Sequence, residues 1–153
     1  MNTIHANALV IDGTGILILG PSGSGKSELA LDLIDQCRQR GVPAILVADD
    51  RLVLEKRNGA VWARVPPTIA GLIEVRGAGI YRLDFRAEAE MHMAVRLVDA
   101  AVAQRTPEDT PVEVTQGIAL PCMALPRRSF AAVRAVLARL GHYGGIIGPI
   151  STP

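Results

Sequence analysis

Three apolar runs in the first 50 residues predict strands at the start of the chain. Residues 7–12 (NALVID) fit a short strand, and the GTG that follows fits its turn. Residues 16–19 (ILIL) and 44–48 (AILVA) are continuous apolar segments, which is typical of strands buried on both faces. We therefore expect these two strands to lie inside the fold.

Between these two runs the apolar period changes to that of a helix. Apolar residues recur four positions apart at Leu29, Leu33 and Cys37, which predicts a helix over residues 27–40. Gly41 is typical of a helix end. Strand, loop, helix and strand form a βαβ unit, which we expect to cross over in the right-handed sense.

The second half of the chain carries weaker strand patterns. Residues 51–65 predict a hairpin that turns at Asn58-Gly59, a dipeptide that favours tight hairpin turns. Residues 93–99 (MAVRLVD) predict another strand, and the polar residues 105–111 predict a loop. Prolines interrupt the apolar residues 118–126, so we expect an edge strand there.

The last regular element is predicted to be a helix over residues 130–140, capped by Ser129 and ended by Gly141. The residues expected on its buried face are Phe130, Val133, Val136, Leu137 and Leu140. The sequence shows no repeats and no break in composition. We therefore expect a single domain over residues 1–141 and a loosely held tail over 142–153.

Composition and charge exclude several classes of protein. The 153 residues are 49% apolar but only 3% aromatic, so the core must consist mainly of aliphatic side chains. A formal net charge of +1 does not indicate the clustered basic surface of a nucleic-acid-binding protein. No apolar run approaches the roughly 20 residues of a membrane span, and no secretory signal is evident. Cys37 and Cys122 fit no disulfide framework or zinc spacing, so we expect a reduced, cytoplasmic protein.

The loop between the second strand and the first helix carries the first candidate chemistry. Its sequence satisfies G-x-x-x-x-G-K-[ST], the phosphate-binding P-loop pattern. The residues expected to bind nucleotide are Gly20, Pro21, Ser22, Gly23, Ser24, Gly25, Lys26 and Ser27. Backbone N–H groups and the helix start would face the phosphates, Lys26 would approach the β- and γ-phosphates, and Ser27 would ligate Mg²⁺. The alternative is a glycine turn that only caps a helix.

Acidic residues supply the second candidate group. Asp49 and Asp50 end the strand after the P-loop helix, as in a Walker B element, where one carboxylate serves the metal and the other accepts a proton. Glu74 and Arg76 lie two positions apart, so on a strand they share a face that suits metal and phosphate. The alternatives are a solvated strand end for the aspartates and an exposed ion pair for the other two residues.

Four motifs in a fixed order give the chain a family resemblance. They are IHAN at 4–7, GPSGSGKSE at 20–28, LVADD at 46–50 and GLIEVRGAGI at 71–80. The set closely resembles the catalytic domain of bacterial HPr kinase/phosphorylase, and EVRGAGI looks like the signature segment of that family. His5 follows the start almost at once, so we expect a compact form of the α-proteobacterial type without the N-terminal regulatory domain.

The resemblance implies a fold and an activity. The fold would be an α/β P-loop fold that resembles the nucleotide-binding core of phosphoenolpyruvate carboxykinase, with a mixed β-sheet and flanking helices. The activity would be ATP- and Mg²⁺-dependent phosphorylation of a serine in HPr or a paralogous phosphocarrier of the phosphotransferase system. Such enzymes also catalyse the reverse phosphorolysis, in which inorganic phosphate attacks and pyrophosphate leaves, and they assemble as hexamers.

The resemblance also assigns roles by position. Asp50 matches the general base, with Asp49 beside it. His5 matches an active-site histidine, although a lone histidine near a terminus is by itself usually a surface residue. Ser27 and Glu74 match the Mg²⁺ ligands.

Basic residues complete the assignment. Lys26 would stabilise charge on the transferred group, and Arg76 lies in the segment 73–82 that the family uses in both directions. Arg105, unassigned by its loop alone, is the candidate for a later catalytic arginine. Arg127 and Arg128 fall in the segment tied to dephosphorylation.

Two other hypotheses stay open at this point. A P-loop small-metabolite kinase has a similar length and the same opening βαβ unit, but it normally needs an arginine-bearing lid, which residues 83–128 do not show convincingly. A nucleotide-sensing module would dock a phosphocarrier without turnover and would not depend on the carboxylate of Asp50.

Overall fold

A computed structural model describes residues 3–103, 105, 110–115 and 117–144 of the chain. The strands are β1 (Thr3–His5), β2 (Asn7–Ile11), β3 (Thr14–Leu19), β4 (Ala44–Ala48), β5 (Arg51–Arg57), β6 (Ala60–Arg64), β7 (Leu72–Val75), β8 (Gly79–Arg82), β9 (Glu88–Met91), β10 (Met93–Val98), β11 (Val112–Thr115), β12 (Ile118–Leu120) and β13 (Cys122–Pro126). The helices are α1 (Lys26–Gln39), the 3₁₀ turn η1 (Pro67–Ile69) and α2 (Phe130–Arg139). Within these residues, no helix is long and apolar enough to cross a membrane.

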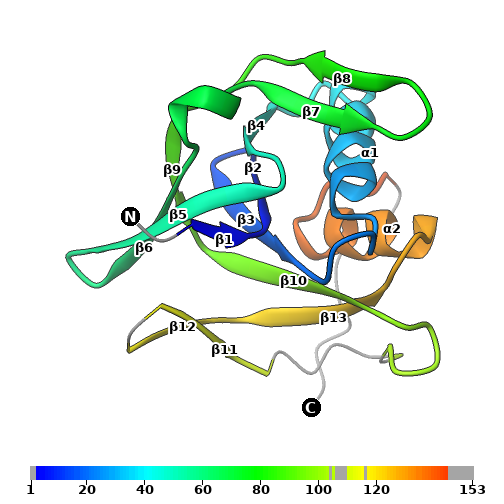
Figure 1. Cartoon of the computed structure of the whole chain (residues 1–153). Coiled ribbons are helices and arrows are strands. Elements are labelled where there is room, and N and C mark those ends of the chain that lie inside the picture. Colours follow the sequence, from blue (N-terminus) through cyan, green and yellow to red (C-terminus); the bar gives the residue numbers. More distant parts are fainter. Residues whose placement is uncertain (1–2, 104, 106–109, 116, 145–153) are drawn as a thin grey trace.

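A mixed five-stranded sheet in the order β13-β10-β3-β2-β4 forms the centre of the molecule (Figure 1). Strand β10 is parallel to both β3 and β13, whereas β2 is antiparallel to both of its neighbours, β3 and β4. Strands β3 and β4 therefore run in the same direction, as the predicted βαβ unit requires, but β2 lies between them. The sequence pattern did not predict this insertion.

The insertion follows from a two-residue hairpin turn. Ile11 pairs with Thr14, and the residues between them, Asp12 and Gly13, have positive φ angles of 46° and 82°. Asp-Gly favours this turn because glycine adopts the left-handed region without steric cost, and aspartate tolerates it. The turn lies one residue earlier than the predicted GTG, so β2 ends at Ile11 and β3 begins at Thr14.

The central sheet is buried on both faces, as its apolar runs predict. On one face, Ile16 and Ile18 pack with buried residues of α1 and α2. On the other face, Leu17 and Val47 pack against the four-stranded sheet β1-β5-β6-β9. The predicted flanking helices thus cover one face only, and a second sheet covers the other. The hairpin of β5 and β6 turns at Asn58-Gly59, as predicted.

The C-terminal part follows the predictions less closely. The predicted edge strand 118–126 divides at Pro121, and its second half, β13, forms an edge of the central sheet. Its first half, β12, pairs with β11, a strand that the polar sequence around it did not indicate. Helix α2 is capped as predicted, since Ser129 Oγ accepts a hydrogen bond from the Ala131 N–H. Phe130 was expected on the buried face of α2, but it is 44% exposed because it lies in the first turn, beyond the covered face.

Candidate functional site

The P-loop connects β3 to α1 at the end of the central sheet. Gly23 and Gly25 have φ angles of 78° and 93°, a region in which other residues are strained. Gly25 is also the N-cap of α1, where no side chain caps the helix. The loop therefore leaves free N–H groups at a positively polarised helix end, which suits an anion.

Lys26 opens α1 and is almost fully buried. Its Nζ donates hydrogen bonds to the carbonyls of Gly20 and Pro21, at 2.9 and 3.1 Å. Burial lowers the pKa of Lys26 below its ordinary value, and the carboxylates of Asp50 and Asp49 oppose this shift. The ammonium group is thus folded against the loop, within the electrostatic reach of both acids.

Asp49 is 8% exposed and accepts three hydrogen bonds. Its Oδ1 accepts from Asn7 Nδ2 and from Ser27 Oγ, both at 2.5 Å. Its Oδ2 accepts from the backbone N–H of Glu74 at 3.1 Å. Because Ser27 donates its proton to Asp49, the lone pairs of its hydroxyl stay available for a cation.

Asp50 lies in a different environment although it is the next residue. Its side chain is 62% exposed, and its backbone has a positive φ of 67°. One carboxylate oxygen lies 3.6 Å from His5 Nδ1, and that histidine ends β1. The left-handed backbone turns the second carboxylate to the rim of the site, where an incoming group can reach it.

Asn7 links the two aspartates, and sequence reasoning assigned it no role. Its amide is fully buried, donates to Asp49 and accepts the backbone N–H of Asp50 at 2.9 Å. The sequence signal for such a role is a polar residue at the start of an apolar strand, because an amide buried there requires hydrogen-bond partners. Asn7 therefore fixes the positions of both acids.

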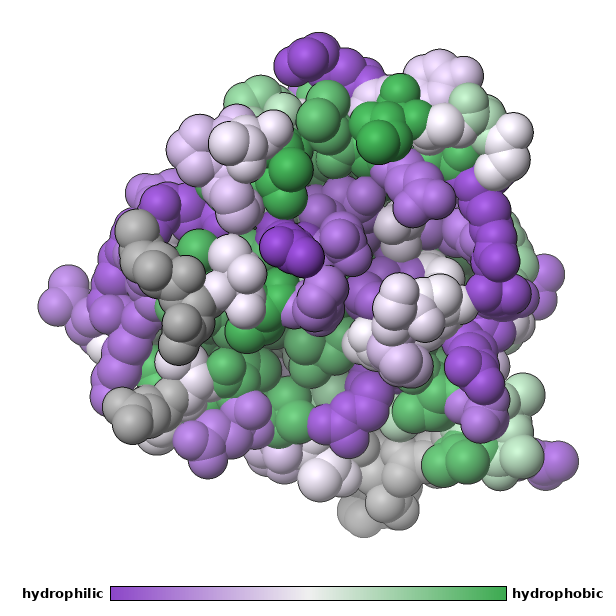
Figure 2. All heavy atoms as spheres, viewed as in Figure 1, coloured by the Kyte–Doolittle hydropathy of each residue, from purple (hydrophilic) through white to green (hydrophobic). Residues whose placement is uncertain are grey.

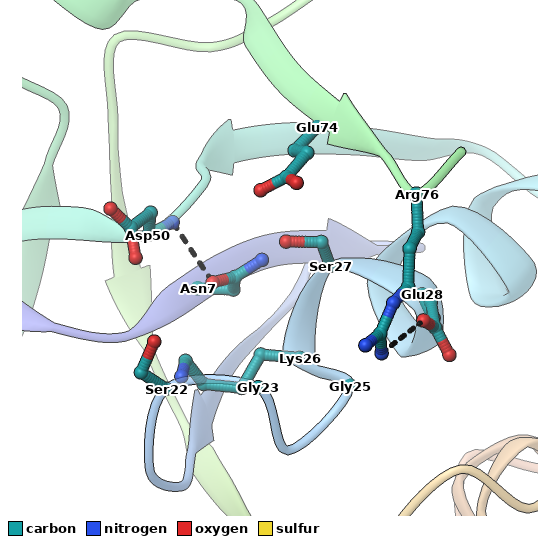
Figure 3. Close-up of a pocket in the computed structure, with 10 residues that line it drawn as sticks. All are labelled: Asn7, Ser22, Gly23, Gly25, Lys26, Ser27, Glu28, Asp50, Glu74 and Arg76. Carbon is teal, nitrogen blue, oxygen red and sulfur yellow. Dashed lines mark hydrogen bonds and ion pairs between the residues drawn. The ribbon is translucent and has the colours of Figure 1, made fainter. Parts of the chain in front are cut away.

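Glu74, on β7, and Arg76, the residue after that strand, both line the cavity, and their roles in binding metal and phosphate stay predictions. Arg76 Nη1 lies 3.8 Å from the carboxylate of Glu28, the residue after the P-loop serine. Figure 3 shows the Glu74 carboxylate and the Ser27 hydroxyl directed into the same space. This space suits Mg²⁺, which prefers hard oxygen ligands and takes one or two carboxylates together with phosphate oxygens.

These groups surround one cavity of about 280 Å³. Its lining residues are Asn7, Ser22, Gly23, Gly25, Lys26, Ser27, Glu28, Asp50, Glu74 and Arg76 (Figure 3). Figure 2 shows hydrophilic residues gathered around the hollow in the middle of this face. The cavity brings together a P-loop, the exposed carboxylates of Asp50 and Glu74, and the guanidinium of Arg76.

A comparison with protein families establishes the relationship of the chain. Residues 1–137 match the family described as the HPr serine kinase C-terminal domain. The chain belongs to this family.

Curated relatives match about half of the chain. An HPr kinase/phosphorylase of Mycoplasma mycoides is 44% identical over 77 residues, which are 50% of this chain and 23% of that protein. One of Bordetella pertussis is 45% identical over 85 residues, which are 55% of this chain and 25% of that protein. The matched segment is thus about a quarter of each relative.

A solved structure matches nearly the whole chain. It is described as the structure of the Hpr(Ser) kinase/phosphatase from Coxiella burnetii, with 31% identity and a TM-score of 0.75. The match covers 92% of this chain and 96% of that one. It confirms the predicted P-loop fold with a mixed sheet.

The arginines predicted later in the sequence of this HPr kinase domain do not line the cavity. Arg105 is exposed between β10 and β11 and is absent from the described lining, so its catalytic role stays a prediction. Arg127 pairs with the carboxylate of Asp99. Arg128, with a φ of 52°, donates to the carbonyl of Gly23 in the P-loop. The role of these two arginines in dephosphorylation also stays a prediction.

Proposed function

We propose that this HPr kinase domain transfers the γ-phosphoryl group of ATP to a serine of HPr or of an HPr-like phosphocarrier. The observation that carries the proposal is the 62% exposure of Asp50 at the rim of a P-loop cavity. An open carboxylate suits a serine presented by another protein better than a metabolite that must be enclosed. This feature favours the proposal over a small-molecule kinase.

In the kinase direction, Asp50 accepts the proton of the serine hydroxyl while its oxygen attacks the γ-phosphorus. The bond from that phosphorus to the bridging oxygen of ADP breaks. Lys26, released from the loop carbonyls, stabilises charge on the transferred group. His5 lies 3.6 Å from Asp50 and orients the carboxylate toward the incoming hydroxyl.

We propose the reverse phosphorolysis at the same site. Inorganic phosphate attacks the phosphorus of phosphoserine, the bond to the serine oxygen breaks, and pyrophosphate leaves. Asp50 returns a proton to the serine oxygen, and the proton lost by the attacking phosphate balances it. Arg76 stands at the wall of the cavity, where a guanidinium can bind either phosphate group.

Ser27 and Glu74 are the residues that would hold Mg²⁺, which neutralises phosphate charge when bound. Asp49 supports this site indirectly through its hydrogen bond from Ser27. A hexameric assembly, from the family resemblance, and a cytoplasmic location, from the free cysteines Cys37 and Cys122, complete the proposal. Sedimentation of the purified protein tests the assembly.

The test is incubation with Mg-ATP and HPr, or its paralogue, followed by mass spectrometry for phosphoserine. We expect phosphoserine with the native protein and almost none with Asp50→Asn. Nucleotide binding without any labelled phosphocarrier would instead support the sensing module. ATP consumption that depends on a metabolite alone would support the small-molecule kinase.

A further inference from the structure

The layout of the sheet gives the bound triphosphate a direction. In the proposed function, Asp50 accepts the proton of the attacking serine and Glu74 would hold Mg²⁺, so the γ-phosphoryl end of the triphosphate lies near both residues. Asp50 follows β4, and Glu74 lies on β7. In the order β13-β10-β3-β2-β4, the P-loop follows β3, and β4 lies on one side of it. The nucleoside end of the triphosphate must therefore point toward the other side, over β10 and β13. In open α/β sheets, ligands bind beyond the carboxyl ends of the strands.

A second cavity, of about 130 Å³, lies on that side. It is formed by the outer face of α1, the ends of β10 and β13, and the first turn of α2. Gly25 and Glu28 line both this cavity and the larger one. Arg128 lines the second cavity and donates to Gly23 in the wall of the first. The two cavities thus meet at the start of α1.

The second cavity is lined by both apolar and polar side chains. Leu29, Leu97 and Val133 are buried side chains in its wall, and Phe130 is a partly exposed aromatic ring beside them. Asp32 adds a carboxylate that can accept hydrogen bonds from N–H groups. Apolar side chains combined with polar groups that fix the orientation of a ligand are typical of sites for small organic ligands.

We propose that this second cavity holds the base and ribose of the nucleoside triphosphate. The base lies among Leu29, Leu97 and Phe130, and the ribose passes Gly25 and Arg128 toward the P-loop. Asp32 accepts a hydrogen bond from an N–H of the base. The assignment rests on the proposed function, since it assumes that the P-loop binds the phosphates of a nucleotide.

The test separates the nucleoside from the phosphates by comparing ATP with inorganic tripolyphosphate. Calorimetric titration in Mg²⁺ measures both affinities for the native protein and two variants. Asp32→Trp places a bulky ring at the cavity. Asp35→Trp is the matched control, because Asp35 is exposed on the same helix, carries the same charge and does not line the cavity.

We expect Asp32→Trp to weaken ATP binding on the order of tenfold or more and to leave tripolyphosphate binding unchanged. Asp35→Trp should leave both affinities unchanged. Phe130→Ala should weaken the binding of ATP but not of tripolyphosphate, and by a smaller factor than Asp32→Trp does. Retained tripolyphosphate binding also shows that each variant is folded.

An Asp32→Trp variant that binds ATP as tightly as the native protein would overturn the assignment. Loss of both ATP and tripolyphosphate binding in Asp32→Trp would also overturn it, because the substitution would then disturb the phosphate-binding P-loop and not a nucleoside site. A native protein that binds neither ligand would reject the proposed function, and the subsite with it.

Discussion

Asp49 and Asp50 are neighbours in sequence, yet they lie in opposite environments. The first is buried with three hydrogen-bond donors, and the second is exposed beside His5. A buried, saturated carboxylate is fixed in position and is suited to ordering the residues around a cation. An exposed carboxylate with few contacts is suited to receiving a proton from an incoming group. The contrast indicates a rigid inner side and an open outer side of one site.

The largest expected effect is on turnover at the outer side. Asp50→Asn removes the base, keeps the side-chain volume and tolerates the positive φ, so kcat should fall about 10²–10⁴-fold. The melting temperature and ATP affinity should change little. Single-turnover phosphorylation and calorimetry check both points. Retention of more than a tenth of the native rate would remove Asp50 from the role of base.

At the inner side we expect the largest loss of stability. Asp49→Ala leaves the amide of Asn7 and the N–H of Glu74 without an acceptor, which should cost about 2 kcal/mol or more of unfolding free energy. Mg²⁺-dependent ATP binding should weaken as Ser27 loses its partner. Urea unfolding with and without Mg-ATP measures both effects. A fully stable variant would contradict the structural role.

A sharper comparison uses Asn7, which contacts both sides. Asn7→Ala should lower the free energy of unfolding by about 1–2 kcal/mol. It should also lower kcat while changing the KM for ATP only slightly. Asn7→Asp places a second carboxylate against Asp49, and this repulsion raises one carboxyl pKa of the pair in the folded state. A raised carboxyl pKa destabilises the fold at neutral pH, and protonation relieves this as the pH falls.

Melting temperatures of the two Asn7 variants, measured between neutral pH and about pH 5, test this direction of the pH dependence. Asn7→Asp should melt below Asn7→Ala at neutral pH, and the gap should narrow on acidification. A gap that does not depend on pH would mean that the two carboxylates do not interact.

The smallest expected effect concerns His5. The side chains of His5 and Asp50 are both exposed to solvent, and contacts between exposed ionisable groups contribute little to stability. His5→Gln should therefore leave the melting temperature unchanged and reduce turnover about threefold to tenfold through a less ordered carboxylate. Steady-state kinetics measures this change. A large loss of stability would show that His5 acts as a structural residue.

Local patterns predicted the parts of this fold that depend on neighbours in sequence. The apolar run of β3, the four-residue spacing in α1 and the Asn58-Gly59 turn all need only short-range information. The same holds for the P-loop pattern and for the acids that follow β4, of which Asp50 lines the same cavity as the P-loop.

Features that depend on distant contacts could not be predicted in this way. Periodicity does not reveal that β2 lies between β3 and β4, because strand order is set by how whole sheets pack. The role of Asn7 depends on partners more than 40 residues away. The exposure of Phe130 depends on how α2 meets the sheet, which its own apolar pattern does not contain.

The position of β2 also determines the spacing of the reaction site. Neighbouring strands lie about 4.8 Å apart, so the strand that leads to the lysine and the strand that ends in the acids are separated by roughly 10 Å instead of one strand width. A phosphoryl group, its cation and an attacking oxygen need a gap of this order. An extra antiparallel strand, placed early in the chain, thus acts as a spacer that makes room for two reactants between Lys26 and Asp50, which both line the cavity.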